Sequence, residues 1–258
     1  MSVEEYLLAK AAQLSPNSSE LVGIERVVAK IKEKLYEWDH IVGVKDIRIY
    51  GSYARKTRLP ISVDRNSDVD LMVIFRYDYK TPKESFYDIL KSFAVANFRD
   101  EIVKDEPSIV ILLDNIKIEM TPAVEMGASI NLQIPTVGDQ YMDWTYTDPF
   151  QLVAMSNEQN RRMNGLYLPM VRLIKYWNIL NGKPFESYKL ENYLSTWIFV
   201  DCNTLFDCLI YAVKNLHPNY CENPLPVVNL HEKIKLAEHF VKYGQGFKAN
   251  ALIDVLFP

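Results

Sequence analysis

The segment from Asp68 to Phe75 places the strongest constraint on the fold. Apart from Asp70, residues 69–75 are all apolar, which is the pattern of a β-strand buried on both faces. The segment also begins with two aspartates, Asp68 and Asp70, separated by one valine. The chain must therefore build a sheet that is covered on both sides, with two carboxylates at the start of a buried strand.

Hydrophobic spacing predicts an α+β fold with two lobes. The first lobe, residues 1–148, is expected to hold a mixed β-sheet with flanking helices, and the second, residues 149–258, to be all-α. A ligand site is expected in the crevice between them. Helices are predicted at about residues 2–13, 18–38 and 82–98, and strands at about 47–49, 69–75, 108–113 and 116–120. Residues 123–135 are predicted to be irregular.

In the second lobe, single residues mark the expected helix ends. Pro169 predicts a kink or break, Asn181-Gly182 predicts a helix end, and Ser187 is expected to cap the next helix. That next helix is apolar nearly all round, so we expect it at the buried centre of the lobe. Apolar residues spaced along 230–241 predict a last amphipathic helix.

Composition narrows the class of protein. Of the 258 residues, 48% are apolar and 24% charged, as in ordinary soluble globular proteins. The formal charge of −4 argues against a protein that coats nucleic acid, so no stable nucleic-acid partner is expected.

The cysteines and the N-terminus indicate the cellular compartment. The chain has three cysteines, an odd number that does not suggest a set of disulfides, which favours a reducing compartment. The residues near the N-terminus include acids, whereas a signal peptide is basic there, so secretion is not expected. No apolar run reaches about 18 residues, the length of a membrane span. We therefore expect a cytoplasmic protein without a membrane partner.

The position of the two aspartates on a strand makes them a candidate metal site. Residues i and i+2 share a strand face, so Asp68 and Asp70 are expected about 6.6 Å apart on one side. Two such carboxylates repel each other unless a cation lies between them, and a pair of Mg²⁺ ions about 3.5–4 Å apart fits this span. Taken alone, an Asp-x-Asp pair is more often a solvated pair at a loop edge.

Glu119 is the candidate third ligand. In residues 116–120 the isoleucines and the methionine take one strand face, so Lys117 and Glu119 take the other. If this strand neighbours the one that begins at Asp68, three carboxylates converge. Such a group suits Mg²⁺, which prefers oxygen ligands and keeps some of its water.

A phosphate site is expected where the strand at 47–49 ends in Gly51-Ser52. Glycine lets the backbone approach a phosphate closely, and the N–H groups and hydroxyl of such a turn bind anions. Further positive charge follows in the same loop, from Arg55, Lys56 and Arg58. Gly51 and Ser52 are therefore candidate substrate-binding residues.

Two other clusters are expected to take no part in the chemistry. Cys208, His217 and Cys221 lack an evident fourth ligand at useful spacing, so a zinc site is not expected. Arg161 and Arg162 fit a solvated helix face better than a nucleotide contact.

Taken together, these segments resemble the DNA polymerase β-like nucleotidyltransferases, and in particular their CD-NTase branch. That branch comprises bacterial cyclic-oligonucleotide synthases related to cyclic GMP–AMP synthase and oligoadenylate synthase. The resemblance runs from about Ile47 to Leu194. It is carried by IRIYGSYARKT, NSDVDLMVIF, IKIEMTPAVE, LQIPTVGDQYMDWTYTDP, VRLIKYWN and SYKLENYL. Glu119 stands where many members have Asp, and Lys56 where a small glycine is usual.

The resemblance implies metal-dependent nucleotidyl transfer. Asp68, Asp70 and Glu119 would be catalytic and would bind two Mg²⁺ ions, or Mn²⁺. A ribose hydroxyl of one nucleoside triphosphate would attack the α-phosphate of another, and pyrophosphate would leave. The expected product is a cyclic or short linear oligonucleotide second messenger, sensed by a separate effector protein in antiphage signalling. The alternatives are transfer to a protein, tRNA or small molecule, and an inactive nucleotide-binding homologue.

The resemblance also implies which residues bind the substrate. Ser52, Lys175 and Ser187 would contact the donor triphosphate, and Tyr188 would stack on its base. Each of these four residues has an ordinary alternative. Ser52 suits a plain turn serine. Lys175 suits a solvated helix face, Ser187 a helix cap, and Tyr188 a tyrosine of the core.

Overall fold

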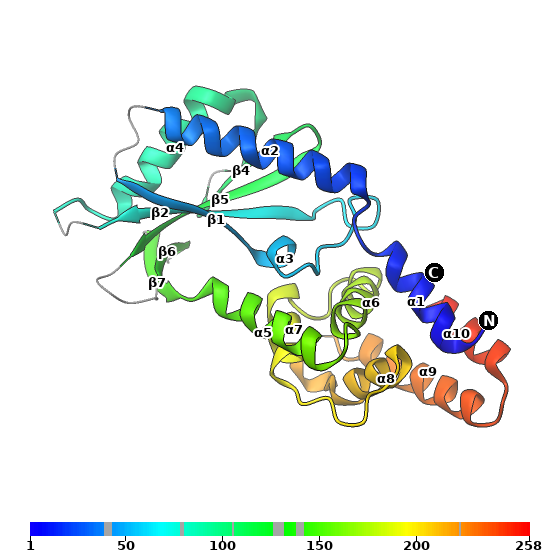
Figure 1. The fold of residues 1–258 in the computed structure, drawn as a ribbon. Coiled ribbons are helices and arrows are strands. Elements are labelled where there is room, and N and C mark those ends of the chain that lie inside the picture. Colours follow the sequence, from blue (N-terminus) through cyan, green and yellow to red (C-terminus); the bar gives the residue numbers. More distant parts are fainter. Residues whose placement is uncertain (39–42, 78–79, 105, 126–131, 138–141, 222) are drawn as a thin grey trace. The chain divides into compact units, whose positions relative to one another are not determined.

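A computed structural model describes residues 1–38, 43–77, 80–104, 106–125, 132–137, 142–221 and 223–258. The chain packs as two compact units (Figure 1). The sheet unit comprises Asn17–Lys56 and Asn66–Val153, and the helical unit comprises Met1–Pro16, Thr57–Arg65 and Ala154–Pro258. The expected lobe boundary at residue 148 lies near the end of the sheet unit, but two earlier segments pack within the helical unit.

In the described residues, the sheet unit is built on one seven-stranded sheet. Its strands are β1 (Val44–Tyr50), β2 (Asp68–Arg76), β3 (Ile102–Lys104), β4 (Ile109–Leu113), β5 (Ile116–Glu125), β6 (Leu132–Val137) and β7 (Met142–Thr147). The order is β1-β2-β5-β4-β3, and β6 pairs with both β5 and β7. β2 and β5 run parallel, whereas the other pairs are antiparallel. The predicted α+β class with a mixed sheet is confirmed.

Two helices, α2 (Ser18–Glu37) and α4 (Glu84–Phe98), cover one face of the sheet (Figure 1). Alternate residues of β2 pack beneath them, each of them fully buried: Val69, Leu71, Val73 and Phe75. On the other face, Met72 and Ile74 form a smaller core with residues of β5 and β6. Both faces of β2 are therefore buried along this length, as its composition predicts.

The prediction that residues 123–135 are irregular is wrong for the part that the structure describes. β5 continues through Pro122 to Glu125, and β6 begins at Leu132, while residues 126–131 lie outside the described residues. A proline usually signals the end of a central strand. Here β4 pairs with β5 only as far as Met120, and β6 pairs with it only from Val124. Pro122 lies between these two partners, so on that side its missing N–H costs no ladder bond.

The helical unit contains α1 (Val3–Gln13), most of α5 (Pro149–Arg162), α6 (Tyr167–Leu180), α7 (Ser187–Thr196), α8 (Leu205–Asn215), α9 (Leu225–Lys242) and α10 (Gly246–Leu256). The capping box expected at Ser2 and Glu5 opens α1. Helix α1 belongs to this unit because it packs on α6, α8 and α10. In addition, the carboxylate of Glu4 accepts hydrogen bonds from the N–H groups of Leu205 and Phe206 at the start of α8.

Pro169 does not break a helix. It lies in the first turn of α6, where proline is tolerated because the N–H it lacks would have no intrahelical partner. The predicted end at Asn181-Gly182 is confirmed, and Gly182 has a φ of +78°. The predicted helix at 230–241 lies within α9, and α10 follows it.

Helix α7 is not apolar all round. Its buried residues lie on one side, whereas Tyr188 and Tyr193 are exposed. The prediction was wrong because it considered how many hydrophobic residues the helix holds and not on which side of the helix each one lies. None of the helices in the described part of the chain combines the length and apolar character that crossing a bilayer requires.

Candidate active site

Three carboxylates converge on the sheet face that α2 and α4 do not cover. Asp68 and Asp70 begin β2, and Glu119 lies on β5 in register with Asp70. The three residues are half-buried, and each offers an oxygen within 4.8 Å of the others. The predicted adjacency of the two strands is confirmed. Among the described residues, no other group of three or more His, Cys, Asp or Glu side chains converges in this way.

Strand alternation places these carboxylates. On β5, Ile118 and Met120 are fully buried under α2 and α4, so Glu119 between them faces the opposite side. On β2, Val69 is likewise fully buried under these helices, so the two aspartates beside it, Asp68 and Asp70, face the opposite side. A slip of one residue in either strand would turn carboxylates into the apolar core. Burial of the apolar face therefore fixes the register that brings the three acids together.

The backbone of Gly51 passes directly beside Asp70. β1 ends at Tyr50, which pairs with Asp70, and the short helix α3 (Gly51–Ala54) follows. Gly51 has a φ of +66°, a conformation that favours glycine. A Cβ atom at Gly51 would lie 1.7 Å from Oδ2 of Asp70. Glycine is therefore required for the carboxylate to keep its place. The phosphate contact expected of Gly51 and Ser52 stays a prediction.

Ser108 orients the third acid. Its Oγ donates a hydrogen bond to Oε1 of Glu119, and the serine is 3% exposed. Sequence reasoning missed this residue. The available signal was the antiparallel pairing of β4 with β5, which places Ser108 diagonally opposite Glu119 on the same face. The bond holds one carboxylate oxygen and restricts the rotamers of a side chain one methylene longer than aspartate.

Tyr50 is a half-buried neighbour of the cluster that sequence reasoning also missed. Its hydroxyl lies 2.9 Å from Oγ1 of Thr121. Burial, and next the negative charge of Asp70, raise the pKa of Tyr50 above its ordinary value. Tyr50 therefore keeps its proton and adds no negative charge to that of the acids.

Lys175 is buried within the helical unit. It lies on α6 and is 7% exposed, and its Nζ forms an ion pair of 2.8 Å with Oε1 of Glu191 on α7. The alternative of a solvated lysine is therefore wrong. Its expected contact with a triphosphate stays a prediction.

Ser187 and Tyr188 open α7. Ser187 is not the cap, because the chain is already helical there; Glu186 holds the cap position in an extended conformation, without a side-chain cap bond. Tyr188 is 54% exposed, so the alternative of a core tyrosine is wrong. Contact of Ser187 with a triphosphate and stacking of Tyr188 on a base stay predictions, as does a site between the two units.

A family model described as the Second Messenger Oligonucleotide or Dinucleotide Synthetase (SMODS) domain matches residues 1–160. The chain belongs to this family. A curated relative of this SMODS protein, a probable cyclic nucleotide synthase of Bacillus cereus (strain VD146), is 38% identical over 50 residues. The match covers 19% of the present chain and only 15% of the length of that relative.

Solved structures share the fold of the SMODS chain. CdnG of Bradyrhizobium diazoefficiens, a CD-NTase in complex with GTP, has a TM-score of 0.74 at 12% identity over 98% of both chains. CdnC of E. coli MS115-1 with ATP has a TM-score of 0.71 at 14% identity, over 100% of this chain and 97% of its own. DncV of Vibrio cholerae, a cyclic AMP–GMP synthase in complex with nonhydrolyzable GTP, has a TM-score of 0.60 at 15% identity, over 92% and 76%. The predicted family, the CD-NTase branch of the nucleotidyltransferases, is confirmed.

The donor set of the SMODS acid cluster suits a hard divalent cation. All three side chains offer oxygen, the ligand type that Mg²⁺ and Mn²⁺ prefer. Half-buried carboxylates this close together repel one another unless a positive charge offsets them. The residues therefore fit the metal ions that the resemblance implies.

Two minor predictions concern the helical unit. Arg161 and Arg162 both pair with Glu158 on an exposed face of α5, at 2.8 and 2.7 Å, so the solvated alternative is confirmed. In the described residues, Cys208, His217 and Cys221 form no group that could hold a metal ion.

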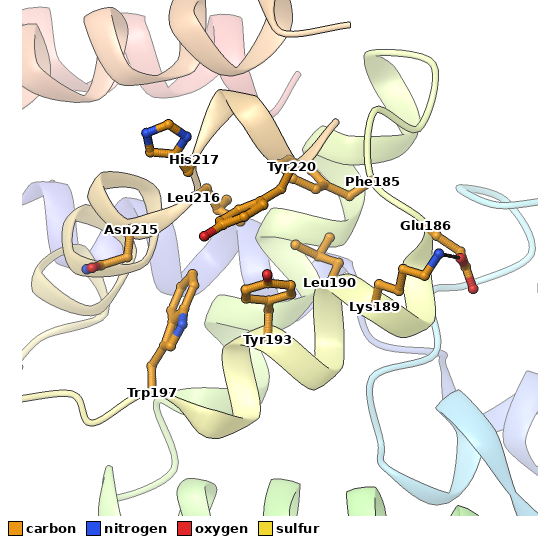
Figure 2. A pocket seen from close by; sticks show the side chains of 10 residues that line it. All are labelled: Phe185, Glu186, Lys189, Leu190, Tyr193, Trp197, Asn215, Leu216, His217 and Tyr220. Atoms are coloured by element: carbon orange, nitrogen blue, oxygen red, sulfur yellow. Dashed lines mark ion pairs between the residues drawn. The ribbon is translucent and has the colours of Figure 1, made fainter. Parts of the chain in front are cut away.

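The helical unit also has a small aromatic pocket, shown in Figure 2, with a volume of about 60 Å³. The rings of Tyr193, Trp197 and Tyr220 line it, above an apolar floor. Neither Lys175 nor Tyr188 is among its lining residues. Its lining residues Glu186 and Lys189 nevertheless flank Ser187 and Tyr188 in the chain, so the pocket borders the start of α7.

Proposed function

We propose that this chain condenses nucleoside triphosphates into a cyclic or short linear oligonucleotide and releases pyrophosphate. The observation that carries the proposal is the convergence of Asp68, Asp70 and Glu119 in a chain of the SMODS family. The relatives add support, because CdnG and CdnC bind GTP and ATP and DncV is named a cyclic AMP–GMP synthase.

In this proposal the three carboxylates hold two divalent cations, Mg²⁺ or Mn²⁺. When bound, such cations lower the pKa of the attacking ribose hydroxyl and offset the charge on the leaving pyrophosphate. Asp68 and Asp70 serve as their ligands. Glu119 serves as a ligand and as the acceptor of the hydroxyl proton, at the oxygen that Ser108 does not contact.

The proposed step is a balanced displacement at phosphorus. The ribose oxygen of one nucleotide forms a bond to the α-phosphorus of the donor, and the bond from that phosphorus to pyrophosphate breaks. Ser52, Lys175 and Ser187 bind the triphosphate, and the exposed ring of Tyr188 stacks on the base. Positioning and electrostatic stabilisation supply most of the rate, as in other phosphoryl transfers.

The resemblance supports a wider proposal for the product. We propose that it acts in the cytoplasm as a signal to a separate effector protein in antiphage defence. Transfer of the nucleotide to a protein, tRNA or small molecule would use the same acids on a different acceptor.

The test is product analysis from purified protein with all four nucleoside triphosphates and Mg²⁺ or Mn²⁺. We expect pyrophosphate release and an oligonucleotide whose mass identifies its bases and its cyclic or linear form. Labelled nucleotide attached to a macromolecule would favour the acceptor alternative. No pyrophosphate with either metal, even in the presence of an inducing phage lysate, would favour an inactive homologue.

A further inference from the structure

Three buried polar side chains form one network in the helical unit. Oε1 of Glu191 pairs with Nζ of Lys175 at 2.8 Å, and Oε2 of Glu191 accepts a hydrogen bond from Oγ1 of Thr57. The residues are 1%, 7% and 0% exposed, respectively. The charge of the lysine is therefore balanced in the interior, and the carboxylate of Glu191 is fixed from two sides.

The network joins the segments to which the proposed function assigns the donor nucleotide. The segment Thr57–Arg65 lies in the chain between Ser52 and Asp68, yet it packs within the helical unit. Glu191 follows Ser187 by one helical turn on α7. One carboxylate thus connects the loop after Ser52 with both helices that carry the predicted triphosphate contacts.

Lys175 has hydrogen-bonding capacity that the network does not use. A lysine ammonium carries three N–H groups. Within the described part of the chain, its only hydrogen-bond acceptor is Glu191. Buried donors are normally satisfied, so the remaining N–H groups need acceptors from outside the protein. The oxygens of a triphosphate are such acceptors, and their negative charge is complementary to the positive charge of the ammonium.

A purely stabilising role accounts poorly for this arrangement. A buried ion pair is a weak source of stability, because its replacement by apolar side chains is often neutral or favourable. A group that must meet a phosphate has a stricter requirement. A misplacement of about 1 Å can cost on the order of 100-fold in rate.

We propose that Glu191 is a positioning residue that holds the Lys175 ammonium where it meets the donor triphosphate, and that Thr57 orients Glu191. This inference rests on the proposed function, because the nucleotide supplies the partner of Lys175.

The first test is Glu191→Gln, which keeps the shape of the side chain and removes its charge. We expect the KM for nucleoside triphosphate to rise about 10- to 100-fold, with a smaller change in kcat. The Kd of a nonhydrolysable ATP analogue should rise by a similar factor. The Mn²⁺ affinity measured without nucleotide should stay unchanged, because the acid cluster lies in the sheet unit.

The matched control is Gln159→Met. Gln159 is also a buried polar residue of the helical unit, and it donates to the carbonyl oxygens of Ser195 and Trp197 at 2.9 and 2.7 Å. The variant should lose thermal stability and keep the KM of the wild type. A rise in KM for this control equal to that of Glu191→Gln would overturn the inference, because a general loss of packing would then explain both.

Two further variants separate positioning from folding. Thr57→Val removes the hydroxyl at nearly constant volume and should raise the KM, whereas Thr57→Ser keeps the hydroxyl and should restore it. Lys175→Met with Glu191→Met removes both members of this ion pair, so neither of the two is left charged in the interior without the other. The double variant should bind the ATP analogue weakly.

The outcomes distinguish the two claims. If Lys175→Met raises the Kd of the analogue but Glu191→Gln and Thr57→Val leave it unchanged, the positioning role is wrong and the proposed function stands. If the double methionine variant binds the analogue like the wild type, Lys175 does not meet the triphosphate and the inference fails. If the wild type makes no product, the proposed reaction fails, while the analogue Kd still decides the positioning role.

Discussion

Gly51 and Asp70 fit together only because Gly51 has no side chain. The position of a Cβ atom on Gly51 lies 1.7 Å from Oδ2 and 2.4 Å from Cγ of Asp70, well inside any contact that atoms tolerate. The glycine that was expected to approach a phosphate therefore has a second role. It makes room for a carboxylate of the acid cluster.

Gly51→Ala should displace Asp70 and weaken divalent metal binding. Alanine at a φ of +66° also costs about 1–2 kcal/mol of backbone strain. We expect a lower free energy of unfolding in urea and, separately, a loss of Mn²⁺ affinity in a calorimetric titration.

Gly244→Ala is the control for backbone strain. Gly244 has a similar φ of +71°, and nothing lies within 4 Å of a Cβ atom there. It should show the loss of stability with unchanged Mn²⁺ affinity. Equal Mn²⁺ affinity in Gly51→Ala and the wild type would contradict the role assigned to the contact with Asp70.

Ser108→Ala should lower the affinity for Mn²⁺ about 10-fold, because hydrogen bonds to metal-binding side chains typically contribute at least that much. The alanine removes the donor to Glu119 and frees its carboxylate to rotate. Ser156→Ala is the matched control, since Ser156 is a buried serine whose hydroxyl has no partner among the described residues. Loss of affinity in the control, or none in Ser108→Ala, would show that Ser108 does not orient Glu119.

Alkaline pH should destabilise the protein partly through Cys208. Burial, and next the neighbouring Cys202, raise the pKa of the Cys208 thiol to about 12. The unfolded thiol loses its proton near pH 9, so from about pH 9 to 12 the folded state binds more protons than the unfolded state. The free energy of unfolding must then fall as pH rises, by at most about 1.4 kcal/mol per pH unit from this group.

Urea unfolding at about pH 8, 9, 10 and 11 checks this prediction against the variant Cys208→Ala. The variant should be less stable at pH 8 because it leaves a cavity. Its stability should nevertheless decline less steeply with pH than that of the wild type. Parallel curves would show that Cys208 does not hold its proton in the folded state.

The acid cluster could be predicted from the sequence because it depends on local periodicity. Alternation along β2 and β5 assigns Asp68, Asp70 and Glu119 to one face of their strands, and only the adjacency of the strands remained to be found. The mixed sheet and the helical second part followed from the same periodicities.

Contacts between distant segments could not be predicted in this way. Nothing near Thr57 in the chain indicates that its hydroxyl bonds Glu191, 134 residues later. Likewise the capping box of α1 is visible in the sequence, whereas its place in the helical unit depends on partners such as Asp254, which pairs with Lys10. Residues 123–135 show the opposite error: they were expected to be irregular, yet β5 continues to Glu125 and β6 begins at Leu132.

The double variant Asp68→Asn with Asp70→Asn should fold and, without metal, unfold with a free energy no lower than that of the wild type. The substitution removes repulsion between half-buried carboxylates and keeps their shape. Thermal unfolding in EDTA measures this directly. A large loss of stability would mean that the two aspartates support the fold rather than a metal.

The most direct test of the central claim is calorimetric titration of Mn²⁺ into the wild type and this double variant, each with a nonhydrolysable ATP analogue bound. The account predicts that the wild type binds two Mn²⁺ ions per chain and that the double variant loses both. Equal Mn²⁺ binding by the two proteins would contradict it.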